Sequence, residues 1–198
     1  MSSKPSRNKV AGIIIAAGES KRLGRIKQLL PWSGKPLIEF IIQTALQCKL
    51  EPINVILGSN FDQITPFLDD SKVNIIFNRR WKEGKGTSIS LGINSLPERI
   101  DAALVFVVDQ PFLSIQLINA LLKVYKLKKA DIVAPYIHGI QTNPVLFDRL
   151  VFPELKELNG KEGGRMIFKK YKLEKLIWED EKILLDIDTP EDYQKIIS

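Results

Sequence analysis

Two continuous apolar runs constrain the fold of this chain more than any other feature of its sequence. They are VAGIIIAA at residues 10–17 and AALVFVV at residues 102–108, and both contain β-branched side chains. Strands buried on both faces of a parallel sheet read as unbroken apolar runs, whereas strands exposed on one face alternate with polar residues. The two runs therefore predict a buried parallel sheet in which residues 10–17 form the first and central strand.

Shorter segments of both kinds follow in alternation. Strand-like segments lie at residues 53–58, 73–77, 131–136, 144–147, 173–178 and 183–188, and helix-like segments lie at 36–48, 60–70, 87–96, 113–129 and 189–197. Such alternation implies right-handed crossovers and a three-layer α/β/α sandwich with a Rossmann-like, mostly parallel sheet. The less regular last third permits an antiparallel strand or a hairpin on that sheet. No linker or repeat divides the chain, so we expect one domain over residues 1–198.

The composition excludes several kinds of active site. Cys48 is the only cysteine and His138 the only histidine, which excludes an intrachain disulfide and any site that needs two histidines. We expect Cys48 to be buried and inert, and His138 to lie in a surface loop. Any catalysis must then use carboxylates, cations and backbone groups.

The net charge of +6 favours an anionic partner. The lysines of KVYKLKK at residues 123–129 fit the solvated face of a helix, and no nucleic-acid motif appears, so we expect no nucleic-acid partner. No apolar run approaches the roughly 20 residues of a membrane span. No signal-peptide segment precedes the first strand, and we expect a cytoplasmic protein without a membrane partner.

The loop that follows the first strand combines glycines with cations. AAGESKRLGRIKQLLPWSGKPLI contains Gly18, Gly24, Gly34, Lys21, Arg22, Arg25 and Lys27. Glycine lets the backbone approach a ligand closely, and cations offset the charge of phosphate, so the loop predicts a phosphate cradle. It matches neither the Walker loop nor the dinucleotide motif, and a solvated basic turn is the alternative.

Three aspartates are candidates for a metal site beside this loop. Asp109 is the first polar residue after the run at 102–108, and Asp186 and Asp188 lie two apart, on one face of a predicted strand. Carboxylates near a phosphate cradle are typical Mg²⁺ ligands, although an aspartate after a strand can also serve only to shape a turn. The next residues are typical of a helix start and are expected to be structural: Thr189, Pro190, Glu191 and Asp192.

The loop resembles the signature of the nucleotidyltransferases that attach a nucleotide to molybdopterin. The matching positions are Ala16, Ala17, Gly18, Ser20, Arg22, Gly24, Lys27, Leu30, Pro31, Gly34 and Pro36. NRRWKEGKGTSISLGI resembles a second segment of that family at Asn78, Trp81, Gly84, Ser88 and Gly92, while Arg79 and Lys85 stand where the family usually has proline and methionine. For Trp81, simple core packing is the alternative to a place beside the nucleotide.

This resemblance implies a fold of the nucleotide-diphospho-sugar transferase type and a set of site residues. The implied nucleotide-binding residues are Ala16, Ala17, Gly18, Ser20, Arg22, Gly24, Lys27, Asn78, Gly84 and Ser88. The implied catalytic residues are Arg22, Lys27 and Asp109, because Asp-Gln-Pro at 109–111 resembles the metal-binding turn of molybdenum cofactor cytidylyltransferases. Mg²⁺, or Mn²⁺ in its place, is expected on Asp109 and Asp188, with Asp186 in reserve.

Two further segments, at residues 142–147 and 159–165, resemble the family segments that face the pterin, with Asn143 in place of histidine and Lys161 in place of aspartate. The implied acceptor-binding residues are Gln110, Asn143 and Pro144. Ala-Ala-Gly at the loop resembles the cytidylyl members, so the resemblance implies transfer of CMP from CTP to molybdopterin, with a molybdoenzyme or its chaperone as a further partner. Transfer to a sugar or polyol phosphate, and a noncatalytic nucleotide- or cofactor-binding protein, are the alternatives.

Overall fold

The computed structural model describes residues 9–197 and is organised around an eight-stranded sheet. The strands are β1 (Val10–Ala16), β4 (Ile53–Leu57), β5 (Asn74–Phe77), β6 (Ala102–Val107), β7 (Ile132–Ile137), β8 (Ile140–Gln141), β9 (Val145–Asp148) and β10 (Leu173–Ile177). Their order is β10-β7-β9-β6-β1-β4-β5, and β8 pairs with β7. A separate two-stranded hairpin consists of β2 (Pro31–Trp32) and β3 (Lys35–Pro36).

Strand β1 lies at the centre of this sheet. It pairs in parallel with β4 on one side and with β6 on the other. Strand β9 runs antiparallel to both β6 and β7, while β10 is again parallel to β7. The predicted central strand and the mostly parallel sheet with an antiparallel insertion are therefore confirmed.

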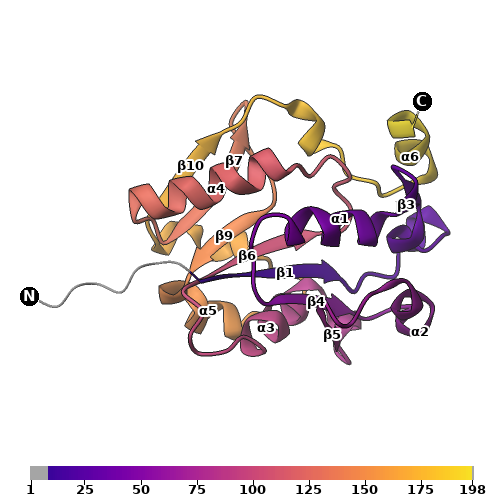
Figure 1. Cartoon of the computed structure of the whole chain (residues 1–198), viewed down its shortest axis with the longest axis horizontal. Coiled ribbons are helices and arrows are strands. Elements are labelled where there is room, and N and C mark those ends of the chain that lie inside the picture. The colour runs from indigo at the N-terminus through magenta and orange to yellow at the C-terminus, as the bar shows by residue number, and fades with distance from the viewer. Residues whose placement is uncertain (1–8, 198) are drawn as a thin grey trace, which may run out of the picture.

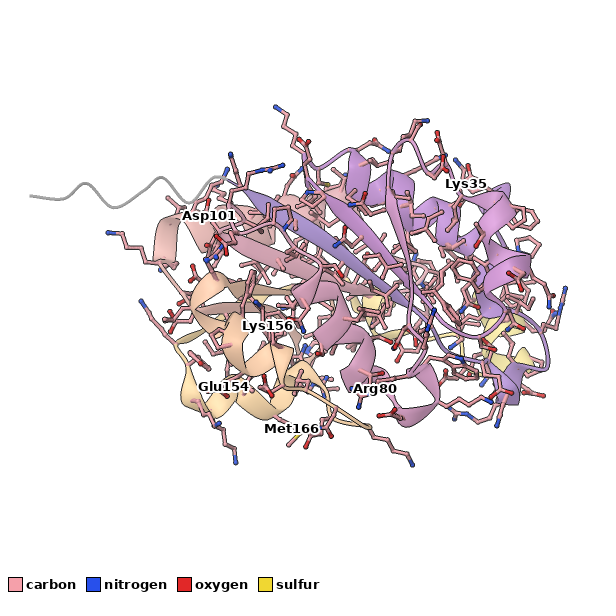
Figure 2. All side chains as sticks on the ribbon, turned by 90° about the horizontal axis from the view of Figure 1, so that it is seen from below. Lys35, Arg80, Asp101, Glu154, Lys156 and Met166 are labelled. Carbon is pink, nitrogen blue, oxygen red and sulfur yellow. The ribbon has the colours of Figure 1, made fainter. Side chains whose placement is uncertain are left out.

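Helices cover both faces of the sheet. They are α1 (Leu37–Leu46), α2 (Phe61–Ile64), α3 (Lys85–Asn94), α4 (Ile115–Lys128), α5 (Phe152–Lys156) and α6 (Pro190–Ile197). Figure 1 shows α1 and α4 on one side of the sheet, with α3 and α5 on the other. Figure 2 shows the side of the sheet that is covered by α3 and α5, and it labels Glu154 and Lys156 of α5.

Alternating side chains of β1 supply both cores. Ile14 packs in the cluster that contains α1 and α4, and Ile13 packs in the cluster that contains α3 and α5. Both side chains are fully buried, as a strand between two helical layers requires. The predicted α/β/α sandwich is confirmed. Within residues 9–197 no helix is both long and apolar enough to cross a membrane.

Two expected elements differ in the structure. The segment predicted as a strand at 183–188 instead forms a 3-10 helix at Glu181–Leu184 and then an irregular segment, so that prediction is wrong. The sheet edge beside β7 is taken by β10, and the backbone N–H of Ile187 instead donates to the carbonyl of Asp109, 2.9 Å away. The helix expected at 60–70 is only α2 followed by a 3-10 turn that contains Pro66, whose ring removes a backbone donor.

Close packing of α3 on β1 generates a prediction about stability. A Cβ added to Gly92 would lie 2.5 Å from Cγ2 of Ile13. Alanine improves helix propensity by about 1 kcal/mol, but overpacking of a core costs about 1–3 kcal/mol. Because Ile13 is β-branched and held in the central strand, we expect overpacking to dominate. Gly92→Ala should lower the melting temperature by about 2–6 °C in a thermal unfolding experiment.

Gly18→Ala provides the matched control for this measurement, because nothing lies within 4 Å of a Cβ built at Gly18. We expect no loss of melting temperature there. A Gly92→Ala protein as stable as the wild type would contradict the packing argument.

Candidate active site

The first loop turns tightly after β1. It contains a 3-10 turn at Lys21–Leu23 and returns through a second at Lys27–Leu29. The backbone is left-handed at Ser20 and at Gly24, with φ of 58° and 66°. The hydroxyl of Ser20 accepts a hydrogen bond from the backbone N–H of Lys27 at 3.3 Å. The turn thereby places a row of cations at the carboxyl end of β1, where ligands bind in such sheets.

A buried glutamine ties the start of this loop together. Gln28 is only 1% exposed, and its Nε2 donates to the carbonyl oxygens of Ala16, at 2.7 Å, and Gly18, at 3.2 Å. The side chain therefore orients the backbone on both sides of Ala17. Sequence analysis missed this role, although a polar residue within an apolar stretch was an available signal.

The ammonium of Lys27 lies between two carboxylates. Its Nζ is 2.8 Å from Oδ1 of Asp188 and 3.6 Å from Oδ2 of Asp109. The Lys27 side chain is 10% exposed, so water screens these charges less than it would at the surface. Sequence analysis predicted that Asp109 and Asp188 would come together, and the structure places both at one cation.

Arg22 makes a second ion pair with Asp188. Its Nη2 is 2.7 Å from Oδ2 of Asp188, but the arginine side chain is 72% exposed. The hydrogen bond from Lys27, together with the charges of Lys27 and Arg22, outweighs burial and lowers the pKa of Asp188. An exposed ion pair contributes little stability, so Arg22 can turn toward another anion at low cost.

Asp186 has the opposite electrostatic environment. Desolvation and the negative charge of Asp109 raise the pKa of Asp186 to about 6, although the side chain keeps contact with solvent. Burial is the larger cause of this raised pKa, and repulsion by the Asp109 carboxylate adds to it. A bound cation would relieve that repulsion.

A cavity of about 320 Å³ lies between the loop and these carboxylates. Seven of the predicted site residues line it: Ala16, Gly18, Ser20, Arg22, Lys27, Asp109 and Asp188. Lys21, Gln28 and Lys85 line it as well. The cavity thus brings a cationic, glycine-bearing backbone and a pair of carboxylates to the same space.

A second cavity, of about 340 Å³, lies beside the first and shares Ile15, Lys85 and Val107 with it. Its polar lining consists of Lys85, Gln141, Asn143, Lys161, Arg165 and Asp186, and its apolar lining includes Phe147, Met166 and Phe168. Figure 2 labels Met166 on the segment that follows α5 in the chain. Asn143 is the only predicted acceptor residue among the described residues of this lining; Arg165 ends the segment 159–165 that was expected to face the pterin, and sequence analysis missed Gln141.

The other predicted site residues lie outside the lining of both cavities. They are Ala17, Gly24, Asn78, Gly84, Ser88, Gln110 and Pro144, none of which lines either cavity. Asn78, for example, is buried and donates from Nδ2 to the hydroxyls of Thr87 and Ser88, both at 2.9 Å. Their direct contact with a ligand remains a prediction.

Gln110 and Trp81 also make structural contacts. Gln110 donates from Nε2 to Oγ1 of Thr142 at 2.8 Å, which joins the turn after β6 to the strand segment before Asn143. Trp81 packs on Gly58, where an added Cβ would lie 2.5 Å from Cβ of Trp81. Trp81 thus has a structural contact, although it is half-buried and belongs to neither core cluster.

The donor set fits a divalent cation that arrives with a phosphate ligand. Across the described residues no group of three or more acidic, histidine or cysteine side chains could hold a metal alone. Asp109 and Asp188 nevertheless direct carboxylate oxygens at one ammonium, so the pair already accommodates a positive charge. Mg²⁺ is usually held by one or two carboxylates together with substrate phosphates and water.

The mostly parallel sheet, the cationic loop after its first strand and the paired carboxylates opposite are the arrangement that the resemblance to nucleotidyltransferases predicts. The chain belongs to the family of the MobA-like NTP transferase domain, whose model matches residues 12–176. The resemblance to molybdopterin nucleotidyltransferases is therefore confirmed at the level of the family.

Named relatives cover almost the whole chain. The purine catabolism protein PucB of Bacillus subtilis is 29% identical over 197 residues, which cover 93% of this chain and 94% of PucB. The molybdenum cofactor cytidylyltransferase of Escherichia coli is 25% identical over 185 residues, covering 91% and 92% of the two chains. Two relatives with different names thus have similar sequence identity to this chain.

Solved structures share the fold. Rv0371c of Mycobacterium tuberculosis has a TM-score of 0.86 at 22% identity, over 96% of this chain and 97% of that one. A second structure of Rv0371c is a complex with manganese, with a TM-score of 0.80 at 20% identity, over 96% and 98% of the chains.

The buried amide of Gln28 generates a second prediction. Gln28→Glu replaces the N–H donors with an oxygen that faces two carbonyl oxygens, so the new side chain must either be protonated or repel them. We expect a loss of about 2–4 kcal/mol in the free energy of unfolding at pH 7, measured with urea. Gln63→Glu makes the same chemical change at an exposed helix position and should be nearly neutral. Equal effects of the two substitutions would disprove the role of Gln28.

Proposed function

We propose that this protein is a metal-dependent nucleotidyltransferase that transfers CMP from CTP to the phosphate of molybdopterin and releases pyrophosphate. The observation that carries the proposal is the position of Lys27 between Asp109 and Asp188 at the wall of the first cavity. The wall of this cavity provides the side-chain cation of Lys27 to bind a triphosphate. It also provides the carboxylates of Asp109 and Asp188 to bind the metal ion that accompanies the triphosphate.

In this proposal the triphosphate binds along the first loop. The backbone at Gly18 lies against the phosphates, because no side chain of its own separates it from the cavity. Lys27 neutralises the phosphate nearest the carboxylates, and Arg22 leaves its exposed ion pair to bind another phosphate. Both residues then stabilise the charge that builds up on the departing pyrophosphate.

The reaction needs no protein nucleophile. An ionised phosphate oxygen of the acceptor attacks the α-phosphorus, a new P–O bond forms, and the bond to the bridging oxygen breaks with its electron pair leaving on pyrophosphate. Asp109 and Asp188 would hold a divalent ion, which would supply charge neutralisation at the reacting phosphates. The protein contributes alignment and a preorganised set of charges, which agrees with a chain that has one histidine and one cysteine.

The second cavity is the proposed acceptor site. Phe147, Met166 and Phe168 offer an apolar wall to a ring system, while Asn143 and Gln141 offer hydrogen-bonding groups. The preference for CTP rests on Ala16, Ala17 and Gly18, the form of the loop that resembles cytidylyl members. A molybdoenzyme or its chaperone would receive the product.

A substrate survey tests the proposal. Purified protein is incubated with each of the four nucleoside triphosphates, with Mg²⁺ or Mn²⁺, and with molybdopterin or a sugar phosphate, while pyrophosphate release is measured. We expect the fastest release with CTP and molybdopterin, and none after chelation of the metal. Pyrophosphate release with a sugar or polyol phosphate, but not with molybdopterin, would show that molybdopterin is not the acceptor. Tight CTP binding without any product would favour a noncatalytic nucleotide-binding protein.

Asp109→Asn tests the carboxylate pair directly. The substitution keeps the shape of the side chain but removes the charge that faces Lys27, so we expect kcat to fall at least about 100-fold. Asp62→Asn, at an exposed position of α2, is the matched control and should keep wild-type turnover. Circular dichroism checks that both variants fold. Unchanged pyrophosphate release by Asp109→Asn would remove Asp109 from the metal site.

A further inference from the structure

Lys85 occupies the wall between the two cavities. Among the described residues it is the only charged residue that lines both of them. Its two companions in the shared wall, Ile15 and Val107, are apolar. An anionic group at the junction of the two cavities would therefore lie beside Lys85.

Backbone packing holds Lys85 in this place. It is the first residue of α3, and the preceding Gly84 adopts φ 132° while packing so closely on Gly160 that a Cβ would lie 2.2 Å from the Gly160 oxygen. The N–H of Gly86 donates to the same carbonyl at 3.0 Å. The start of α3 is thus attached to the loop at residues 159–163.

The side chain of Lys85 lies across Gly163. A Cβ added to Gly163 would lie 2.8 Å from Cε and 3.2 Å from Nζ of Lys85. The lysine therefore occupies the space that a side chain at position 163 would fill. The exposed side chain of Lys85 thus lies against the backbone at Gly163.

The charge of Lys85 is available to a ligand. Lys27 and Arg22 are paired with carboxylates, whereas the side-chain ammonium of Lys85 makes no ion pair with any residue within 9–197. Lys161 and Arg165 add positive charge to the second cavity, against the single carboxylate of Asp186. That excess suits a ligand with a phosphate group on an otherwise apolar body.

We propose that Lys85 binds the attacking phosphate of the acceptor at the point where the two substrates meet. This inference rests on the proposed function, because it assigns the second cavity to a phosphorylated acceptor. In-line transfer requires that phosphate to approach the α-phosphorus across the shared wall, and Lys85 is the cation at that wall. A methionine at this position could not make the contact, because its thioether has neither a charge nor an N–H donor.

Lys85→Met tests the assignment with molybdopterin as the acceptor. We expect kcat/KM for the acceptor to fall about 10–100-fold, as for loss of one charge-assisted hydrogen bond, while the Kd of CTP measured by calorimetry changes less than about threefold. Lys85→Arg retains the charge and should restore most of the activity. If the methionine variant fails to fold, Lys85→Gln provides the same comparison.

Lys82→Met is the matched control. Lys82 lies three residues away, its Nζ is 5.5 Å from the Trp81 ring centre, and it lines neither cavity. Removing its charge should leave kcat/KM for the acceptor unchanged. Equal kinetics for the Lys85→Met and Lys82→Met proteins, in an active wild-type background, would overturn the Lys85 proposal and leave the proposed function standing.

Phosphate binding separates the two possible failures. If the wild-type protein transfers no nucleotide to any acceptor, the proposed function is wrong. Anion binding by Lys85 can then still be tested with inorganic phosphate as the probe. In ³¹P NMR titrations Lys85→Met should weaken phosphate binding at least about tenfold relative to Lys82→Met. Equal phosphate affinity of the two variants would show that Lys85 binds no anion at this wall.

Discussion

The contact on which the site depends is the placement of the Lys27 ammonium between the carboxylates of Asp109 and Asp188. It joins three segments that are distant in sequence, namely the first loop, the turn after β6 and the segment before α6. Because Lys27 is largely removed from water, a change at one carboxylate is felt at the other. Without the lysine, two negative groups would face each other across the cavity.

Contacts on the far side of Asp188 keep this arrangement in place. Oδ2 of Asp192 accepts from the N–H groups of Asp188 and Thr189, and the Thr189 hydroxyl caps the start of α6 by accepting from the N–H of Asp192. The hydroxyl of Tyr193 then donates to the carbonyl of Pro31 at 2.7 Å. The residues expected to be structural thus hold the carboxylate that faces the cavity. Figure 1 shows α6 beside β3, at the end of the sheet toward which β1 runs.

Several side chains of the recognised segments orient the backbone or join elements around the site. Gln28 orients two carbonyl groups, Asn78 joins the turn before α3 to that helix, and Gly92 lets α3 approach Ile13. The Nε2 group of Gln28 and the Nδ2 group of Asn78 donate to backbone and hydroxyl oxygens, as buried donors require. A motif match alone does not separate such residues from those that meet a ligand.

The sequence by itself determined the α/β class, the central strand, the cationic loop and the family, because these depend on local periodicity, on composition and on a long motif. It also predicted that Asp109 and Asp188 come together, although it placed Asp188 on a strand that does not form. Only the tertiary structure decided that Asp188 rather than Asp186 contacts Lys27, that Gln28 supports the loop, and that Lys85 lies between two cavities. Those facts depend on packing between segments up to 161 residues apart, and no local pattern encodes that packing.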